Sequence, residues 1–133
     1  RIVGPARNET QVELSMTDAR TLGVHEELRV SGDLTGTHGG ITIQGPKGSI
    51  ALTQGAIIAL RHLHIEPEYA KALGIQHGDR IAVEIAGERA VTFHNVAVRA
   101  REGIDALALH LDTDEGNAAG IEKPTYATFL HKE

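Results

Sequence analysis

Short runs of alternating apolar and polar residues, each closed by a turn-forming residue, dominate this 133-residue chain. Alternation with a period of two is typical of strands that bury one face. Fifteen glycines against four prolines indicate many tight turns rather than disorder. The pattern therefore predicts a mainly β fold, with strands at Gln11–Leu14, Leu28–Val30, Gly40–Gln44, Arg80–Ile85, Ala90–Phe93, Val96–Arg99 and Ala106–Leu111.

Two short segments have the signature of a helix. Pro67–Leu73 begins with proline, which suits the first helical position, and Gly74 follows directly. Thr17–Leu22 is stopped in the same way by Gly23. The residues after Asn117 show no clear period, so the tail is expected to be irregular.

The two predicted helices belong to a repeated stretch of sequence. V-E-L-S-M-T-D-A-R-T-L-G-V, from Val12, aligns with L-H-I-E-P-E-Y-A-K-A-L-G-I, from Leu63. Both read as strand, short helix, glycine stop and a second strand. We infer an internal duplication: two small β-barrels capped by short α-helices, in residues 1–59 and 60–133. The alternative is that two unrelated strand–helix corners look alike.

Composition excludes several classes of partner. A formal net charge of −5 argues against nucleic acid, which normally needs a concentrated basic face. No apolar run approaches the roughly 18 residues that cross a bilayer, so no membrane is expected. The absence of cysteine excludes disulfides, fits a cytoplasmic protein and leaves His, Asp and Glu as metal ligands.

The strongest local signal for chemistry is R-H-L-H at Arg61–His64. In a strand, His62 and His64 project from one face while Leu63 faces the other. A third imidazole is available from His110, in A-L-A-L-H-L-D, where the leucines would face the opposite side. Three His ligands with an open fourth position are typical of a catalytic zinc site. The alternative is a His pair on the solvent face of a strand.

Other titratable and glycine-rich segments fit weaker interpretations. The carboxylate of Glu13 aligns with His64 in the repeat, and Arg7 could hold a phosphate through two parallel hydrogen bonds. G-P-K-G at Gly45–Gly48 lacks the spacing of a phosphate-binding loop and reads as a hairpin connection. The remaining histidines are interpreted as solvated: His25, His38, His77, His94 and His131.

D-T-D-E-G-N at Asp112–Asn117 resembles the start of a calcium loop, but the fit fails. An EF-hand loop needs Gly at its sixth position and Glu at its twelfth, where this chain has Asn117 and Lys123. We interpret the segment as a polar turn that positions its neighbours.

Six motifs occur in one order along the chain: G-P-x-R-x-x-T-Q-V-E-x-S, S-G-D-x-x-G, G-P-K-G, R-H-x-H, x-x-x-A-x-x-L-G-I-x-x-G-D and H-x-D-T-D-E-x-N-A. This ordered set, from about Arg1 to Ala118, resembles the PduL-type phosphate acyltransferases. These are the phosphotransacylases of propanediol and related bacterial microcompartments. The resemblance implies exchange of coenzyme A for phosphate on a short acyl group, with acyl-CoA and phosphate as substrates.

The resemblance also implies two capped β-barrels with a two-zinc active site between them. Carried onto this chain, His62, His64 and His110 resemble the ligands of one zinc, and Glu13 resembles one ligand of the other. Arg7 resembles the phosphate-binding arginine. The positions that resemble the family's coenzyme A contacts are Arg1, His110 and Asn117.

The chain departs from the family at its beginning. Family members start with a further segment, which supplies two more ligands to the Glu13 zinc, and nothing precedes Arg1 here. Residues 1–59 are therefore expected to be the remainder of one barrel, with exposed edges, and residues 60–133 most of the second. The missing segment is an expected partner. From the resemblance we further expect a homodimer, in the cytoplasm or inside a microcompartment and its shell.

Two other functions are compatible with the same residues. A small β-barrel binding module would use the strand–helix corners as pure architecture and leave His62 and His64 on the surface. A zinc hydrolase would share the three-histidine site but would not need Arg7. Neither the acyl group nor the compartment follows from the sequence.

Overall fold

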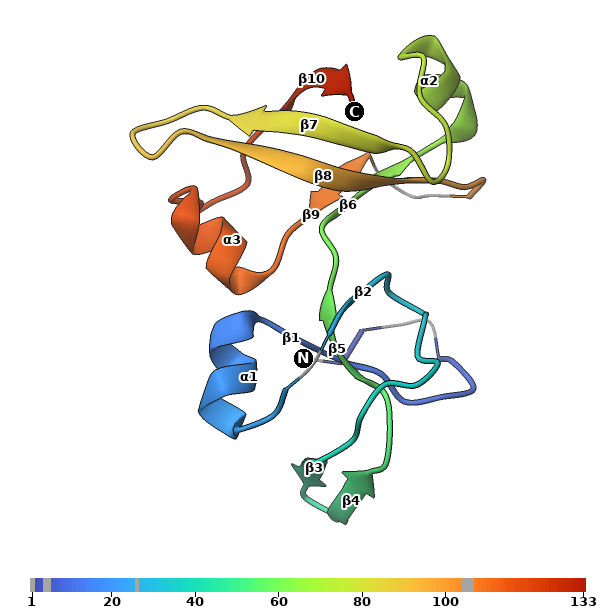
Figure 1. Cartoon of the computed structure of the whole chain (residues 1–133), viewed down its shortest axis with the longest axis vertical. Helices are drawn as coiled ribbons and strands as arrows, with labels where there is room; N and C mark the ends of the chain where they lie inside the picture. Colours follow the sequence, from blue (N-terminus) through green and yellow to red (C-terminus); the bar gives the residue numbers. More distant parts are fainter. Residues whose placement is uncertain (1, 4–5, 26, 104–106) are drawn as a thin grey trace. The chain divides into compact units, whose positions relative to one another are not determined.

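A computed structural model, which describes residues 2–3, 6–25, 27–103 and 107–133, divides the chain into two compact units. These are the N-terminal unit, Arg1–Ala59, and the C-terminal unit, Leu60–Glu133 (Figure 1). Among the described residues, the N-terminal unit holds a three-stranded and a two-stranded sheet, and the C-terminal unit holds a five-stranded one. Within the described ranges, no helix is both long and apolar enough to cross a membrane.

The three-stranded sheet of the N-terminal unit is built around a buried parallel strand. Its order is β1-β5-β2, and both pairings are parallel. The side chains of Ala56, Ile57 and Ile58 on the central strand β5 are at most 5% exposed. The bounds of the three strands are β1 Val12–Leu14, β2 Leu28–Arg29 and β5 Ala56–Ala59.

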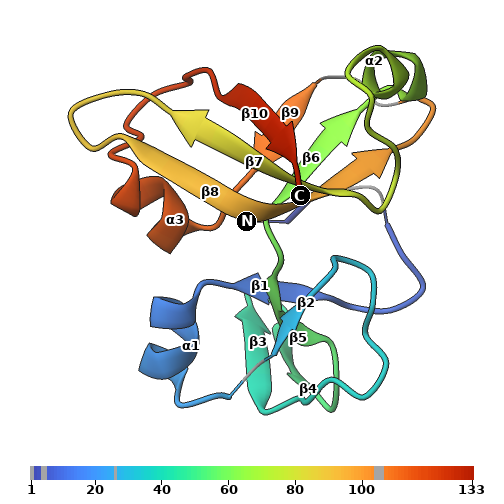
Figure 2. The same ribbon diagram turned by 45° about the horizontal axis from the view of Figure 1, so that its top comes forward.

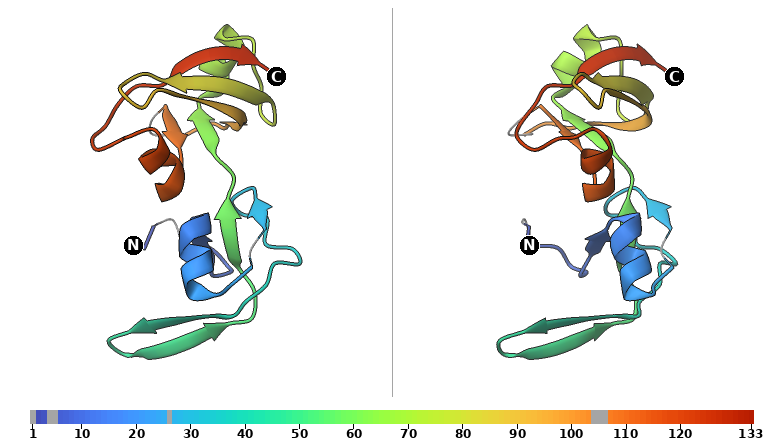
Figure 3. Two further views of the ribbon diagram at one scale, coloured as in Figure 1. Left: turned by 60° about the vertical axis from the view of Figure 1, so that its left-hand side comes forward. Right: turned by 90° about the vertical axis from the view of Figure 1, so that its left-hand side faces the viewer.

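Two further elements of this unit follow simple sequence rules. Helix α1, Met16–Leu22, begins at Ser15, whose side chain accepts a hydrogen bond from the Asp18 N–H. Strands β3, Ile41–Gly45, and β4, Gly48–Leu52, form an antiparallel hairpin (Figure 3). The predicted hairpin connection at Gly45–Gly48 is confirmed.

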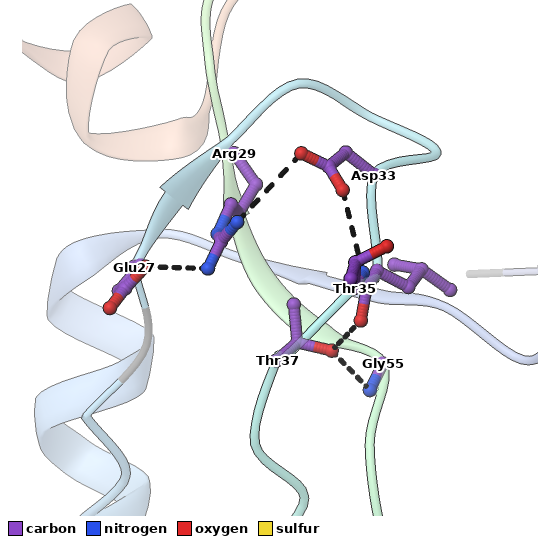
Figure 4. A network of polar contacts seen from close by, with 7 residues as sticks. Glu27, Arg29, Asp33, Thr35, Thr37 and Gly55 are labelled. Atoms are coloured by element: carbon purple, nitrogen blue, oxygen red, sulfur yellow. Dashed lines mark hydrogen bonds and ion pairs between the residues drawn. The ribbon is translucent and has the colours of Figure 1, made fainter.

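A network of polar contacts holds the turn that leads into β5 (Figure 4). The Gly55 N–H donates to Thr37 Oγ1 at 3.0 Å, and that hydroxyl donates to the Leu34 carbonyl at 2.7 Å. On the other side, the Gly55 carbonyl accepts from the Val12 N–H at 2.8 Å. Gly55 therefore connects the loop before β3 to the start of β1.

The C-terminal unit contains, among its described residues, a five-stranded sheet of order β10-β7-β8-β6-β9 (Figure 2). Strand β6 is parallel to β8, and the other pairings are antiparallel. One face carries the core, where Ile65, Ile81, Val96 and Val98 are at most 1% exposed. The strands are β6 His62–Ile65, β7 Arg80–Ile85, β8 Val91–Ala100, β9 Ala108–His110 and β10 Thr128–Lys132.

Helix α2, Pro67–Ala72, follows β6 as α1 follows β1. The two corners share their hydrogen bonds at aligned positions. The Val24 N–H donates to the Ala19 carbonyl, and the Ile75 N–H donates to the Ala70 carbonyl. Gly23 and Gly74 both adopt a left-handed conformation, which glycine enters without steric cost.

The wider duplication and the two barrels are not confirmed. The sheets around the two corners differ in strand number and order, and neither closes on itself among the described residues. In the C-terminal unit β10 and β9 lie at opposite edges of an open sheet. The shared corner is a local likeness between two different sheets.

Other predictions need correction. Asp112–Asn117 is not a polar turn, because α3, Thr113–Ala118, forms there as a capped helix. The tail is not irregular, because β10 pairs with β7. The two strands predicted at Ala90–Phe93 and Val96–Arg99 are replaced by one strand, β8, which runs from Val91 to Ala100 through a bulge. Strands β4 and β5 lack clear alternation and were not predicted.

The Gly55→Ala variant tests the constraint at the start of β5. Gly55 has φ +100, and an added Cβ would lie 2.2 Å from the Thr10 carbonyl oxygen. We expect it to lower the free energy of unfolding by about 1–3 kcal/mol. The measurement is urea unfolding. Gly45→Ala, whose added Cβ would meet nothing closer than 4.0 Å, is the control. Equal midpoints for the two variants would contradict the prediction.

Candidate metal centre

Strand pairing brings three histidines to one face of the C-terminal sheet. In the register of β6 and β9, His62 lies directly opposite His110, and His64 lies two residues along from His62. Leu63 and Leu109, which also face each other, pack against the core. Because side chains alternate across a strand, the three imidazoles project from the opposite face.

The three rings are close enough to share one ion. The ring centroids of His62 and His110 are 4.8 Å apart and the rings are stacked, while His64 lies 4.8 Å from His62 and 4.4 Å from His110. One ligand nitrogen from each ring lies within 4.8 Å of the other two. Zinc–nitrogen bonds of about 2.0–2.1 Å need only a small further convergence.

The His62 ring is held by the backbone. Its Nδ1 lies 2.9 Å from the Leu60 carbonyl oxygen, and the residue is 7% exposed. Since a carbonyl only accepts, Nδ1 donates the proton of this hydrogen bond, and Nε2 is the nitrogen left to bind a metal ion. A histidine whose second nitrogen donates to a carbonyl is the usual arrangement of a metal ligand, because the hydrogen bond fixes both tautomer and ring orientation.

The His64 ring is held in its neutral form. Burial, followed by the nearby His110 and His62 rings and the guanidinium groups of Arg99 and Arg101, lowers its pKa from 6.5 to about 4. An imidazole must be neutral to bind a metal ion. The surroundings of His64 therefore leave it ready to act as a ligand at neutral pH.

Helix α3 is tied to the strand that begins at His62. The Asp112 side chain accepts from the Glu115 N–H at 2.8 Å, and Glu115 Oε2 accepts from the Asp112 N–H at 3.0 Å, which is a capping box. Glu115 Oε1 also pairs with Arg61 Nε at 2.6 Å. One carboxylate thus joins the residue before His62 to the segment after His110.

Sequence reasoning missed several of these residues. Arg99, 8% exposed, is the cross-strand partner of His64 on β8 and was assigned only to a strand. Arg61 and Glu115 were quoted inside motifs without a role. The capping pattern D-x-x-E at Asp112–Glu115 was the available signal, but it was interpreted as a polar turn.

In the N-terminal unit, Glu13 and Arg7 meet the same amide side chain. Gln11 Nε2 donates to Glu13 Oε1 at 2.5 Å, and Arg7 Nη1 donates to Gln11 Oε1 at 3.3 Å. The buried Ser31 hydroxyl also donates to Glu13 Oε1, at 2.8 Å. The Gly32 N–H donates to Gln11 Oε1 at 2.9 Å. Arg7 and Glu13, two of the predicted site residues of this unit, therefore lie in one polar cluster.

The other predicted residues are less constrained by the structure. Asn117 is exposed on α3, and its carbonyl accepts from the Gly120 N–H at 3.1 Å. Arg1 lies outside the described residues. His25, His38 and His77 are exposed, as predicted. His94 and His131 are also exposed, but they form a group with Glu133 that the sequence did not reveal.

Comparison with known proteins identifies the family of this chain. A family model described as phosphate propanoyltransferase matches residues 1–122. The chain belongs to the phosphate propanoyltransferase family. A phosphate propanoyltransferase of Escherichia fergusonii is 47% identical over 131 residues, which are 98% of this chain and 61% of that protein. One of Rhodobacter capsulatus is 43% identical over 92% of this chain and 56% of that protein.

A third relative, the phosphate propanoyltransferase of Citrobacter rodentium, is 49% identical over 125 residues. The matched residues cover 93% of this chain and 59% of the Citrobacter rodentium protein. The chain thus spans about three-fifths of the length of the curated relatives it matches. The family resemblance inferred from the ordered motifs is confirmed.

The pKa of His64 gives a test in the metal-free protein. We expect its imidazole to titrate near pH 4 in NMR-monitored titrations with a chelator present. The His110→Gln variant should raise this pKa, because it removes a repulsive neighbour. Since the folded pKa lies below that of the unfolded chain, 6.5, the unfolded chain binds the extra proton between pH 6.5 and about 4. His64 therefore reduces stability as the pH falls through that window. Titration near 6.5 would contradict the prediction.

Proposed function

We propose that this chain is the larger part of a zinc-dependent phosphate acyltransferase. The enzyme would interconvert a short-chain acyl-CoA plus phosphate with an acyl phosphate plus coenzyme A. The observation that supports this most directly is the convergence of His62, His64 and His110, with Nδ1 of His62 bonded to a backbone carbonyl. The name of the relatives favours propanoyl as the acyl group. Acetyl differs by one methylene, worth only about 1–3 kcal/mol in a pocket.

The donor set fits zinc. Three imidazoles on paired strands leave the fourth position of a tetrahedral ion open to a substrate oxygen. A zinc ion bound there would supply Lewis-acid polarisation of a carbonyl or phosphate oxygen. The lowered pKa of His64 keeps this ligand unprotonated under cellular conditions.

The polar cluster of the N-terminal unit suits an anion and a second metal. Arg7 offers a planar guanidinium, which can hold phosphate through two parallel hydrogen bonds. We propose that Glu13 supplies one ligand of a second zinc, so that the complete enzyme holds two. Ser31 and Gln11 donate to the same oxygen of Glu13 and hold its carboxylate in a fixed orientation.

The reaction needs no covalent enzyme intermediate. Phosphate held by Arg7 attacks the thioester carbonyl carbon through one of its oxygens, and a carbon–oxygen bond forms. The carbon–sulfur bond then breaks, coenzyme A leaves as the thiolate and acyl phosphate remains. This chain has no cysteine that could form a thioester with the acyl group. Contacts to coenzyme A are proposed for Arg1, His110 and Asn117 on the basis of the resemblance.

We infer that a further segment of the protein covers the N-terminal unit. Parallel sheets are normally buried on both faces. The parallel sheet of this unit has only three short strands. Several large apolar side chains on the strands and on the neighbouring elements are exposed, namely Met16, Leu22, Leu28, Ile43 and Ile50. Added strands would complete a barrel in residues 1–59 and supply the other ligands of the Glu13 metal. A homodimer and a cytoplasmic or microcompartment location, with contact to the shell, are part of the same proposal.

The His64→Ala variant tests the metal centre in the protein expressed from its complete gene. We expect it to lose about one zinc per chain by elemental mass spectrometry. Acyl-CoA:phosphate transfer should fall at least about 100-fold, because removing even an outer partner of a metal ligand costs 10–100-fold. His77→Gln, at an exposed histidine outside the cluster, should retain both. Unchanged zinc and turnover in His64→Ala would refute the assignment.

The Arg7→Lys variant separates the acyltransferase from a zinc hydrolase. Lysine keeps the charge but loses the planar pair of donors, so the KM for phosphate should rise about 10-fold or more. The KM for acyl-CoA should change little. A hydrolase would release coenzyme A equally fast without phosphate and would not respond to this substitution. A binding module would hold no zinc and show no turnover at all.

A further inference from the structure

Two irregularities of the C-terminal sheet meet at one residue of β7. On one side, Ile81 pairs with Val96 and Val83 pairs with Phe93, so Ala82 faces the two residues His94 and Asn95. On the other side, Val83 pairs with Phe129 and Ala82 pairs with His131, which leaves Leu130 as an extra residue of β10. Both neighbours of β7 therefore bulge at the level of Ala82. Bulges redirect side chains and are often found beside functional sites.

The bulges bring together side chains from strands that are not adjacent. The ring centroids of His94 on β8 and His131 on β10 are 6.4 Å apart, although β7 lies between the two strands. Ala82, the cross-strand partner of His131, is fully buried and has only a methyl group, so it leaves room for both rings. Asn95 adopts a left-handed φ of 57°, which is uncommon for a residue other than glycine.

A carboxylate completes the group. Glu133 Oε1 pairs with His94 Nδ1 at 2.6 Å, and Glu133 Oε2 accepts from the Asn95 N–H at 2.7 Å. The Glu133 N–H donates to the Arg80 carbonyl at 2.9 Å, which fixes its backbone to β7. One ligand atom from each of His94, His131 and Glu133 lies within 4.8 Å of the others.

We propose that His94, His131 and Glu133 form a binding site for a divalent transition-metal ion, of which Zn²⁺ is the best match. Two imidazoles and one carboxylate are a ligand set that zinc uses in proteins, and the exposed position leaves the remaining coordination sites to water. This site shares no residue with the three-histidine cluster and does not depend on the proposed acyl transfer.

The ion would act as a clamp on the edge of the sheet. Strand β10 is an edge strand, held to β7 through an irregular register. A metal ion bound to His94 and Glu133 would replace the hydrogen bond between His94 Nδ1 and Glu133 Oε1. His131 would add a third ligand, from β10. The ion would thereby join β10 to β8 across β7. Because it binds only the folded arrangement, it would stabilise the folded state.

The test starts from the His64→Ala variant of this chain, so that the three-histidine cluster is already disabled. Calorimetric titration with Zn²⁺ should still show one ion bound per chain, and thermal unfolding should shift to a higher temperature with added Zn²⁺. Adding His131→Gln should weaken binding at least about 10-fold and abolish the shift. His131 takes no part in the hydrogen bonds that hold Glu133 to His94 and Asn95, so the fold should survive. Adding His77→Gln instead should change neither result.

A second measurement does not rely on substitutions in this group. In the His64→Ala variant, Co²⁺ should broaden the amide NMR signals of Ala82, Asn95 and Glu133. The site is wrong if these signals stay sharp, or if the His131→Gln variant binds Zn²⁺ as tightly as its parent. Failure of the three-histidine centre would show separately, as equal zinc content with and without His64→Ala.

Discussion

The pairing of β6 on both of its edges is the constraint on which the candidate site depends. One edge pairs in parallel with β8 and the other in antiparallel with β9. The β9 register sets His110 opposite His62, and the pleat then separates the imidazoles from Leu63 and Leu109 on the core face. A slip of one residue would turn every side chain of β6 to the other face. The partly buried leucines and the buried Ile65 therefore fix the register that gathers the metal ligands.

Polar contacts around α3 also stabilise the end of β6 that carries His62. Glu115 caps α3 with one oxygen and pairs with Arg61 through the other, so the segments on either side of the histidines are joined. Arg61 also lies over the Phe93 ring, 5.2 Å from its centroid. The side chains of Arg61 and Glu115 are both partly shielded from water. Their ion pair therefore contributes more to stability than a fully exposed surface pair would. These contacts constrain the strand end from which His62 projects.

Much of the C-terminal unit could be predicted from the sequence, because the rules involved are local. His-x-His in a strand gives one shared face, and Arg80–Ile85 alternates clearly enough to give its bounds. The proline at the start of α2 and the glycines after α1 and α2 marked those helix ends in the sequence. The failures involve long-range pairing. Strand β10 is exposed except at Phe129, which is partly buried against the core beside Val83. The first three residues of β5 are all buried. Neither strand therefore has the alternation of a half-buried strand.

The two histidine groups of the C-terminal unit show why one was visible in the sequence and the other was not. The pleat of a single strand sets His62 beside His64, and that relation has a fixed spacing of two residues. His94 and His131 are joined through two bulges at Ala82, and a bulge depends on how neighbouring strands pair. No fixed spacing in the sequence indicates that His94 and His131 lie close together. Metal ligands that meet through irregular strand pairing are therefore recognised only in the folded structure. Ligands that lie two residues apart on one regular strand can be recognised in the sequence.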